Sequence, residues 1–139
     1  MKIFCCGCGD FVEARLTNGA EIYPSRADLH ELPFWKCDAC GNYVGCHHKT
    51  SAPTNPLGFI PTPQIRRARK QIHALIDPIW MNGRLTRGKV YRLIARRMGL
   101  DSYHTSKIRT IEEARDVYRA GLEIIEELNR REGHENSAR

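Results

Sequence analysis

Hydrophobic and polar residues alternate in the first third of the chain and recur with helical spacing in the remainder. The alternation over residues 11–16 predicts a strand, Asn18-Gly19 is typical of a hairpin turn, and residues 21–23 predict the returning strand. Further short strands are expected over residues 34–36 and 42–44. The N-terminal part should therefore consist of short strands joined by turns.

Three amphipathic helices are predicted in the second half of the chain. The first is expected to start at Thr62-Pro63 and to be ended or kinked near Asp77 by Pro78. The second is expected over residues 86–99, from a threonine to a glycine C-cap, and the third runs from a capping box over residues 110–131. The apolar positions expected to face the core are Ile65, Ala68, Ile72, Leu75, Ile76, Ile79, Val90, Leu93, Ile94, Met98, Val117, Leu122, Ile125 and Leu128.

The net charge of +6 is distributed very unevenly along the chain. Residues 62–100 contain ten Lys or Arg against Asp77 alone, a net charge of +9, whereas the segments before and after are slightly negative. Solvated helix faces normally mix basic and acidic residues, so this excess is typical of a protein with a polyanionic partner. The residues expected to bind that partner are Arg66, Arg67, Arg69, Lys70, Arg92, Arg96 and Arg97.

Two Cys-x-x-Cys-Gly units, Cys5–Gly9 and Cys37–Gly41, carry the most specific chemistry in the chain. Each offers two thiolates from one tight turn, and its glycine permits a positive φ. Two such turns facing each other supply the four soft ligands that Zn²⁺ prefers, with no coordination position left open. We therefore predict one structural zinc ion, with the ligands Cys5, Cys8, Cys37 and Cys40.

Six cysteines compete for four ligand positions. Cys6 lies inside the first unit, where its side chain should point away from the metal. Cys46, with His47 and His48, follows the second unit, and either Cys46 or a neighbouring histidine could replace Cys8 as a ligand. The alternative is that Cys46 is a small buried residue and the two histidines are ordinary surface groups, and this is the interpretation that we favour.

Disulfide bonds are a second alternative for these cysteines, but they require an oxidising compartment. The chain shows no apolar signal segment before its first cysteine and no apolar run of membrane-spanning length, so we expect a cytosolic protein.

The order of these elements predicts an α+β fold, with a small N-terminal zinc-ribbon-like β unit followed by a three-helix C-terminal region. We expect the β unit over residues 1–50, a Pro-rich linker over 51–62, the basic helical region over 63–131 and a frayed tail over 132–139. A β unit of this size buries little apolar surface, so a metal ion would be needed to stabilise it.

Several short motifs follow one another along the chain. They are Glu21-Ile22-Tyr23-Pro24, Phe34-Trp35 before Cys37, Asn42-Tyr43-Val44-Gly45, His47, Pro56-Leu57-Gly58, Arg66-Arg67-Ala68-Arg69, Asp77-Pro78-Ile79-Trp80, Arg87, Tyr91, Ile94-Ala95 and His104. Over about residues 5–120 the chain resembles the zinc-finger-containing domain of unknown function found in bacteriophages and prophages. The resemblance implies a phage-derived protein of the bacterial host cytoplasm with one zinc ion, and it implies no particular activity. Cys6 and Cys46 depart from the pattern.

Two functions are compatible with these features. The first is a nucleic-acid-binding accessory protein that uses its basic helices to contact phosphates. The alternative is a phage-encoded inhibitor that binds a host nucleic-acid-guided defence complex, in an anti-CRISPR-like role. The partner would accordingly be nucleic acid or a host complex that contains nucleic acid.

An enzymatic function is not expected. A catalytic zinc keeps an open coordination position, and four thiolate ligands leave none. A magnesium nuclease requires clustered carboxylates, whereas the acidic residues of the last predicted helix are spread along its surface.

Overall fold

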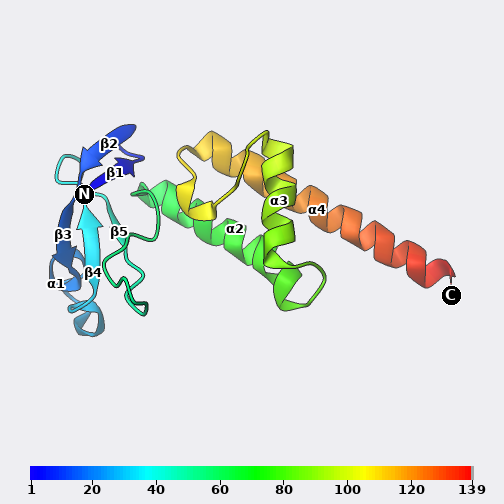
Figure 1. The fold of residues 1–139 in the computed structure, drawn as a ribbon, viewed down its shortest axis with the longest axis horizontal. Helices are drawn as coiled ribbons and strands as arrows, with labels where there is room; N and C mark the ends of the chain where they lie inside the picture. Colours follow the sequence, from blue (N-terminus) through cyan, green and yellow to red (C-terminus); the bar gives the residue numbers. More distant parts are fainter. Residues whose placement is uncertain (139) are drawn as a thin grey trace. The chain divides into compact units, whose positions relative to one another are not determined.

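The computed structural model describes the backbone of residues 1–138 and the side chains of residues 1–133. The chain forms two compact units, Met1–Arg66 and a second unit that begins at Arg67. Antiparallel strands build the first unit and helices build the second, so the fold is α+β as predicted (Figure 1). In the part of the chain that is described, no helix is both long and apolar enough to cross a lipid bilayer.

Five short strands form two antiparallel sheets in the first unit (Figure 1). One sheet pairs β1 (Lys2–Cys5) with β2 (Asp10–Glu13), and the other contains β3 (Arg15–Asn18), β4 (Pro33–Lys36) and β5 (Tyr43–Gly45) in that order. The turns that join β1 to β2 and β4 to β5 contain the two Cys-x-x-Cys-Gly units. This is the strand and turn arrangement of a zinc ribbon, and it confirms the strands expected over residues 34–36 and 42–44.

The strand expected over residues 11–16 is divided between the two sheets. β2 ends and β3 begins on either side of Ala14, whose side chain is buried. The Ala14 N–H donates to the carbonyl oxygen of Met1 at 2.9 Å. One continuous run of residues therefore supplies a strand to each sheet.

The hairpin turn predicted at Asn18-Gly19 is wrong. A short helix, α1 (Gly19–Ile22), begins there, and the Asn18 side-chain oxygen caps it by accepting from the N–H groups of Ala20 and Glu21 at 3.0 and 3.4 Å. β3 pairs with β4 rather than with residues 21–23. Asparagine is favoured both in turns and at helix N-caps, so the local sequence could not decide between them.

The segment predicted as a linker over residues 51–62 has no helix or strand, yet it packs onto the β unit. Ile60 is fully buried. Its N–H donates to the carbonyl oxygen of Phe4 at 2.9 Å, and its own carbonyl oxygen accepts from the N–H of Cys6 at 2.8 Å. These bonds make the segment part of the first unit, ahead of a boundary at Arg66.

The core of the first unit contains two of the four predicted zinc ligands. Val12 and Trp35 pack against it from the side. The buried residues of this core are Ile3, Cys5, Ala14, Cys37, Val44 and Ile60. Because so few apolar side chains are available, the four cysteines and the metal ion that they bind contribute a large part of the stability of this unit.

Three long helices follow the β unit. They are α2 (Pro63–Met81), α3 (Arg87–Met98) and α4 (Ile111–Ala138), and a short 3-10 helix, η2 (Thr105–Lys107), precedes α4. A similar turn, η1 (Ala27–Leu29), follows α1 in the first unit. Only the first turn of α2 belongs to the first unit.

The predicted helix starts are confirmed by their hydrogen bonds. The hydroxyl oxygens of Thr62, Thr86 and Thr110 accept from the backbone N–H three residues further on, at 3.1, 3.2 and 3.1 Å. Gly99 ends α3 with a φ of 68°, which is the left-handed C-cap that its position predicted.

Of the two effects predicted for Pro78, ending the helix is ruled out, because Pro78 lies inside α2. α2 continues to Met81, and the N–H of Asn82 donates to the Pro78 carbonyl oxygen at 2.9 Å. A proline inside a helix costs about 3 kcal/mol. Burial of Ile76 and Ile79 on either side offsets that cost, because both side chains are almost completely enclosed.

The buried stripe of α4 also differs from the prediction. It consists of Ala114, Val117, Ala120 and Ile124, whereas Leu122 is 43 % exposed. A residue five positions after Val117 lies about 140° around the helix from it, which places Leu122 away from the core.

The last helix extends further than the sequence indicates. The sequence predicts an end near Arg131, but α4 continues to Ala138. The tail that was expected to be frayed over residues 132–139 is therefore helical as far as Ala138, and Arg139 lies outside the described residues.

The three long helices pack closely in the second unit. α3 lies against α4. α4 approaches α2 at Gly121, where an added Cβ would lie 2.9 Å from Leu75 Cδ2 and 3.1 Å from Ile76 Cγ2. The absence of a side chain at Gly121 thus allows the close approach of the two helices.

Candidate metal centre

The four predicted ligands meet at one point in the first unit. The sulfur atoms of Cys5, Cys8, Cys37 and Cys40 all lie within 4.8 Å of one another. The Cys5 and Cys40 sulfurs are 3.3 Å apart, and those of Cys8 and Cys37 are 3.6 Å apart. Four sulfurs at about 2.3 Å from a tetrahedral Zn²⁺ are about 3.8 Å from one another. The residues therefore fit a single structural zinc ion held by four thiolates.

The two Cys-x-x-Cys-Gly turns have the same backbone geometry. Gly9 and Gly41 adopt φ values of 70° and 81°. Their N–H groups donate to the carbonyl oxygens of Cys5 and Cys37, four residues earlier, at 2.8 and 2.7 Å. A side chain at either glycine would be strained at such a φ, so the glycines fix the shape of each turn.

Hydrogen-bond donors surround the sulfur atoms. The sulfurs of Cys5 and Cys37 each accept from the backbone N–H groups two and three residues further on. The side-chain amide of Asn42 donates to the Cys40 sulfur at 3.2 Å, and a Cβ at Gly7 would lie only 2.5 Å from that amide nitrogen. These donors stabilise thiolates and orient them toward a common centre.

Without a metal ion, simultaneous ionisation of the four neighbouring thiols is unfavourable. Burial, above all, raises the pKa of the Cys5 thiol to about 12. The pKa of the Cys8 thiol is raised as well, and the main cause is the hydrogen bond that it shares with the Cys37 thiol. For Cys37, burial opposes ionisation, but donation from the Cys40 backbone N–H and from the Cys40 and Cys8 thiols lowers the pKa. A dication at the centre is what allows all four to be thiolates together.

Zinc binding should therefore release protons. At neutral pH cysteine thiols are protonated without metal, since the ordinary cysteine pKa of about 8.5 lies above 7. In the folded turns the raised pKa values of Cys5 and Cys8 oppose ionisation further. We expect at least about two protons to be released per zinc, and the apparent affinity to rise from about pH 6 to about pH 8. Calorimetry of the metal-free protein in buffers of different ionisation enthalpy measures this release. A zinc affinity independent of pH would contradict this prediction. The control is Cys46→Ser, which should behave like the parent chain.

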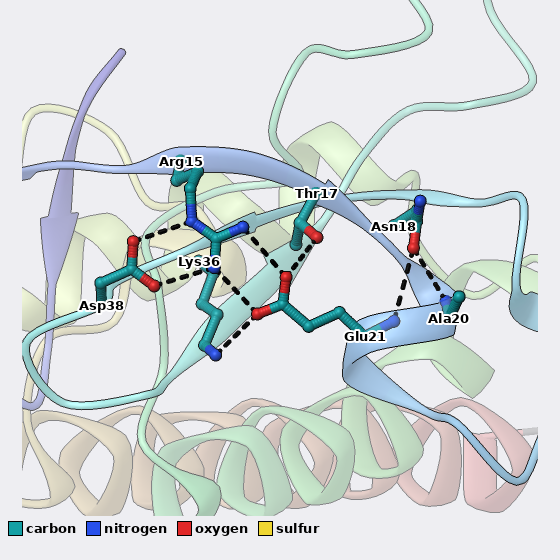
Figure 2. A network of polar contacts seen from close by, with 7 residues as sticks. All are labelled: Arg15, Thr17, Asn18, Ala20, Glu21, Lys36 and Asp38. Carbon is teal, nitrogen blue, oxygen red and sulfur yellow. Dashed lines mark hydrogen bonds and ion pairs between the residues drawn. The ribbon is translucent and has the colours of Figure 1, made fainter.

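A charged network ties the second cysteine turn to α1 (Figure 2). Arg15 donates from Nε and Nη2 to the Asp38 carboxylate at 2.8 and 2.9 Å, and from Nη1 and Nη2 to Glu21 at 3.0 and 2.8 Å. Lys36 Nζ and the Thr17 hydroxyl also donate to Glu21, at 2.8 and 2.7 Å. Because Asp38 lies between two zinc ligands, this network holds the turn in its orientation.

Hydrogen bonding from Arg15 lowers the pKa values of both acids in the network, Glu21 and Asp38. A lowered carboxyl pKa contributes stability above the ordinary pKa of the group, and that contribution is lost as the pH falls through the lowered value. The network is exposed to solvent, so salt screens it. Its main effect is on the orientation of the turn.

The remaining cysteines and histidines lie outside the sulfur cluster. Cys46 is 3 % exposed, and burial raises the pKa of its thiol. His47 and His48 are exposed, and Cys6 is half-buried. Among the described residues, the group close enough to hold a metal contains none of the four. Replacement of Cys8 by Cys46 or a histidine therefore finds no support, and Cys46 is the small buried residue that we favoured.

Two of the predicted binding arginines make structural contacts. The Arg66 guanidinium lies 4.2 Å above the Tyr43 ring and donates to the Tyr43 carbonyl oxygen at 2.8 Å, which fastens the start of α2 within the first unit. Arg69 donates from Nη2 to the carbonyl oxygen of Ile108 at 3.0 Å in the second unit. Both side chains are half-buried and engaged by the protein itself.

A third predicted residue, Arg97, is paired with acids. Its Nε lies 3.4 Å from Glu123 and its Nη2 3.3 Å from Glu127, both on α4. The charge of α3 is therefore partly balanced by a helix far along the chain. The predicted cations that are exposed and take no part in these contacts are Arg67, Lys70, Arg92 and Arg96.

A row of cations follows the exposed face of α3. Lys89, Arg92 and Arg96 are separated by three and four residues, so they project from the same side of the helix. All three are exposed, and none forms an ion pair with a side chain that the structure describes. We call these three residues the α3 cation row. Lys89 was absent from the predicted set, although its position three residues before Arg92 could have indicated it.

The α3 cation row borders a groove between α3 and α4. The groove has a volume of about 340 Å³. It is lined by Leu85, Lys89, Arg92, Leu93, Arg96, Ile124, Glu127, Leu128 and Arg131. We call it the α3–α4 groove.

Comparisons with known proteins identify the family. No curated protein and no solved structure matches the chain. The sequence model of the zinc-finger-containing domain matches residues 1–120, which include both cysteine turns, α2, α3 and the start of α4. Since the match covers most of the chain and the four cysteines are arranged to hold one metal ion, the chain belongs to the family of zinc-finger-containing domains.

Proposed function

We propose that this protein is a zinc-stabilised nucleic-acid-binding accessory protein, and that the α3 cation row contacts phosphates. The observation that carries this proposal is the exposure of Lys89, Arg92 and Arg96 on one side of α3 without acidic partners among the described side chains. Neighbouring like charges on a helix cost a few tenths of a kcal/mol per pair. An anionic partner would offset that cost and release counterions.

In this proposal the zinc ion is a structural element and takes no part in a reaction. Four sulfurs within 4.8 Å of one another leave no ligand position for a substrate. The zinc holds the first unit, and the second unit presents the binding surface. Arg67 and Lys70, exposed on α2, are available for further phosphate contacts.

The resemblance noted in the sequence supports a phage or prophage origin and action in the cytoplasm of a bacterial host. Fractionation of a lysogenic host that produces the protein tests the compartment. Recovery of the protein in the periplasmic fraction would contradict this part of the proposal.

Removing the α3 cation row should remove nucleic-acid binding. We expect the triple variant Lys89→Gln, Arg92→Gln, Arg96→Gln to bind labelled oligonucleotides at least about tenfold more weakly at low salt, because three phosphate contacts are lost. Fluorescence anisotropy of the zinc-loaded chain measures this affinity. For the parent protein, the logarithm of the binding constant should fall linearly with the logarithm of the salt concentration. Zinc content and helicity should be unchanged, since the three side chains are exposed.

A matched control has the same change in charge on exposed arginines of α4. The variant Arg115→Gln, Arg119→Gln, Arg130→Gln should keep its affinity within about twofold. An equal loss in both variants would show that net charge alone attracts the oligonucleotide, which would contradict the assigned site. If the parent protein binds neither single strands nor duplexes, the proposed function is wrong.

A further inference from the structure

We propose that the α3–α4 groove binds unpaired, single-stranded nucleic acid, with a base against its apolar floor and phosphates against its cations. This inference rests on the proposed function and narrows it to one class of nucleic acid. It is carried by the composition of the groove and by the charges around it, both of which belong to the second unit.

The groove combines an apolar floor with a cationic rim. Its volume of about 340 Å³ is enclosed by side chains from α3, from α4 and from the loop before α3. Its aliphatic lining residues are half-buried (Leu85, Leu93 and Leu128) or buried (Ile124), whereas the cations are exposed, and we call the aliphatic residues the floor. The rim carries the α3 cation row on one helix and Arg131 on the other.

The acidic residue that lines the groove does not oppose an anion there. Glu127 lies 2.6 Å from Arg131 Nη2 and 3.3 Å from Arg97 Nη2, so its charge is balanced by two arginines. The three residues of the α3 cation row have no such partner among the described side chains. The groove therefore keeps a net positive rim toward a ligand.

An apolar floor between cations fits a single strand better than a duplex. In a duplex the base faces are stacked on one another, and a protein meets only phosphates and base edges. In a single strand the base faces are free and can pack on protein side chains while the backbone follows a positive groove. A base placed on Leu93 and Leu128 would leave its flanking phosphates near Lys89, Arg92 and Arg96.

The two arginines of the α3 cation row give a second reason to expect a single strand in the groove. A planar guanidinium can stack on a base face as well as pair with a phosphate, whereas the lysine ammonium is a point charge. Arg92 and Arg96 are one turn apart on the same rim. The structure thus offers both apolar and guanidinium surfaces to bases, and neither type of surface selects one base over another. Binding should accordingly depend weakly on sequence.

The test uses the zinc-loaded full chain with a labelled mixed-sequence single strand of about 20 nucleotides, and with the duplex of the same sequence. We expect the single strand to bind at least about tenfold more tightly than the duplex. Its salt dependence should have a slope of about −2, as expected when three phosphates are contacted on a single strand.

Two variants separate the apolar floor from the charge. Leu128→Gln should weaken single-strand binding about fivefold and leave duplex binding and the salt slope unchanged. Leu122→Gln is its matched control, because Leu122 is an exposed leucine of the same helix outside the groove. The double variant Arg92→Lys, Arg96→Lys keeps the charge, so the slope of the salt dependence should be unchanged. Its affinity for the single strand should fall, because the guanidinium groups that can stack on bases are lost.

Three results would overturn the inference. The first is a duplex that binds as tightly as the single strand, which would leave the proposed function intact. The second is a Leu128→Gln variant that behaves like Leu122→Gln. The third is an acidic amphipathic peptide that displaces the single strand and binds the groove more tightly, since such a peptide also presents apolar and negative groups. Failure to bind any nucleic acid would instead refute the proposed function itself.

Discussion

The Cys37→Ser variant is expected to lose its zinc ion and to unfold the first unit. Cys37 is 1 % exposed and belongs to both the sulfur cluster and the small core with Cys5 and Ile60. A structural zinc contributes on the order of 10 kcal/mol to folding, and a unit with so few buried apolar residues cannot replace that contribution. The helices should keep most of their circular dichroism signal, because α2, α3 and α4 bury their own apolar stripes.

Each unit contains one tryptophan that can report its unfolding. Trp35 lies in β4 and Trp80 in α2, so single Trp→Phe variants follow the two units separately by fluorescence. Metal analysis should find one zinc per chain in the parent and in Cys46→Ser, and none in Cys37→Ser. A folded Cys37→Ser protein that retains one zinc per chain would contradict the ligand assignment.

The Gly19→Ala variant is expected to be the most damaging single substitution away from the metal. A Cβ at Gly19 would lie 1.7 Å from the carbonyl oxygen of Leu29 and 3.1 Å from the His30 nitrogen. These are backbone atoms, and the Gly19 N–H is itself held by the Leu32 carbonyl oxygen at 3.0 Å. Since neither segment can move without breaking such bonds, the free energy of unfolding of the first unit should fall by several kcal/mol, roughly 3 or more.

Denaturant unfolding of the zinc-loaded protein, followed by Trp35 fluorescence, measures this loss. Gly88→Ala is the control, because Gly88 is exposed on α3 and an added Cβ there meets nothing within 4 Å. Alanine in that helix should be neutral or stabilising by up to about 1 kcal/mol. A Gly19→Ala protein as stable as its parent would show that α1 and η1 can separate at little cost.

The metal site could be predicted from the sequence because its chemistry is local. Two cysteines three residues apart and a following glycine define each turn, and the two turns adopt the same backbone geometry. The helix starts at Thr62, Thr86 and Thr110 were predictable for the same reason, since a cap depends on neighbours within one turn.

The errors arose where the outcome depends on distant residues. Asn18 fits a hairpin turn and a helix cap equally well, and the pairing of β3 with β4 decides between them. The sequence left open whether the helix ends or continues at Pro78, and the burial of isoleucines on both sides of this proline favours continuation. Leu122 lies on an exposed face because α4 packs through small residues, including Gly121.

The basic surface was the least predictable feature. Arg66 contacts Tyr43, and Arg97 pairs with Glu123, but these partners are more than twenty residues away in the chain. A count of charges within one segment cannot reveal such partners. The structure reduces a broad basic stripe to a few exposed cations, of which the α3 cation row is the continuous part.

We propose that zinc supports the fold while the helices bind nucleic acid. The most direct measurement is a nuclear magnetic resonance titration of the isotope-labelled, zinc-loaded full chain with an unlabelled single strand. We expect the changes in amide chemical shift to concentrate at Lys89, Arg92 and Arg96 and along the α3–α4 groove, with little change over Cys5–Gly9 and Cys37–Gly41. Shifts concentrated at the two cysteine turns, with α3 unaffected, would contradict it.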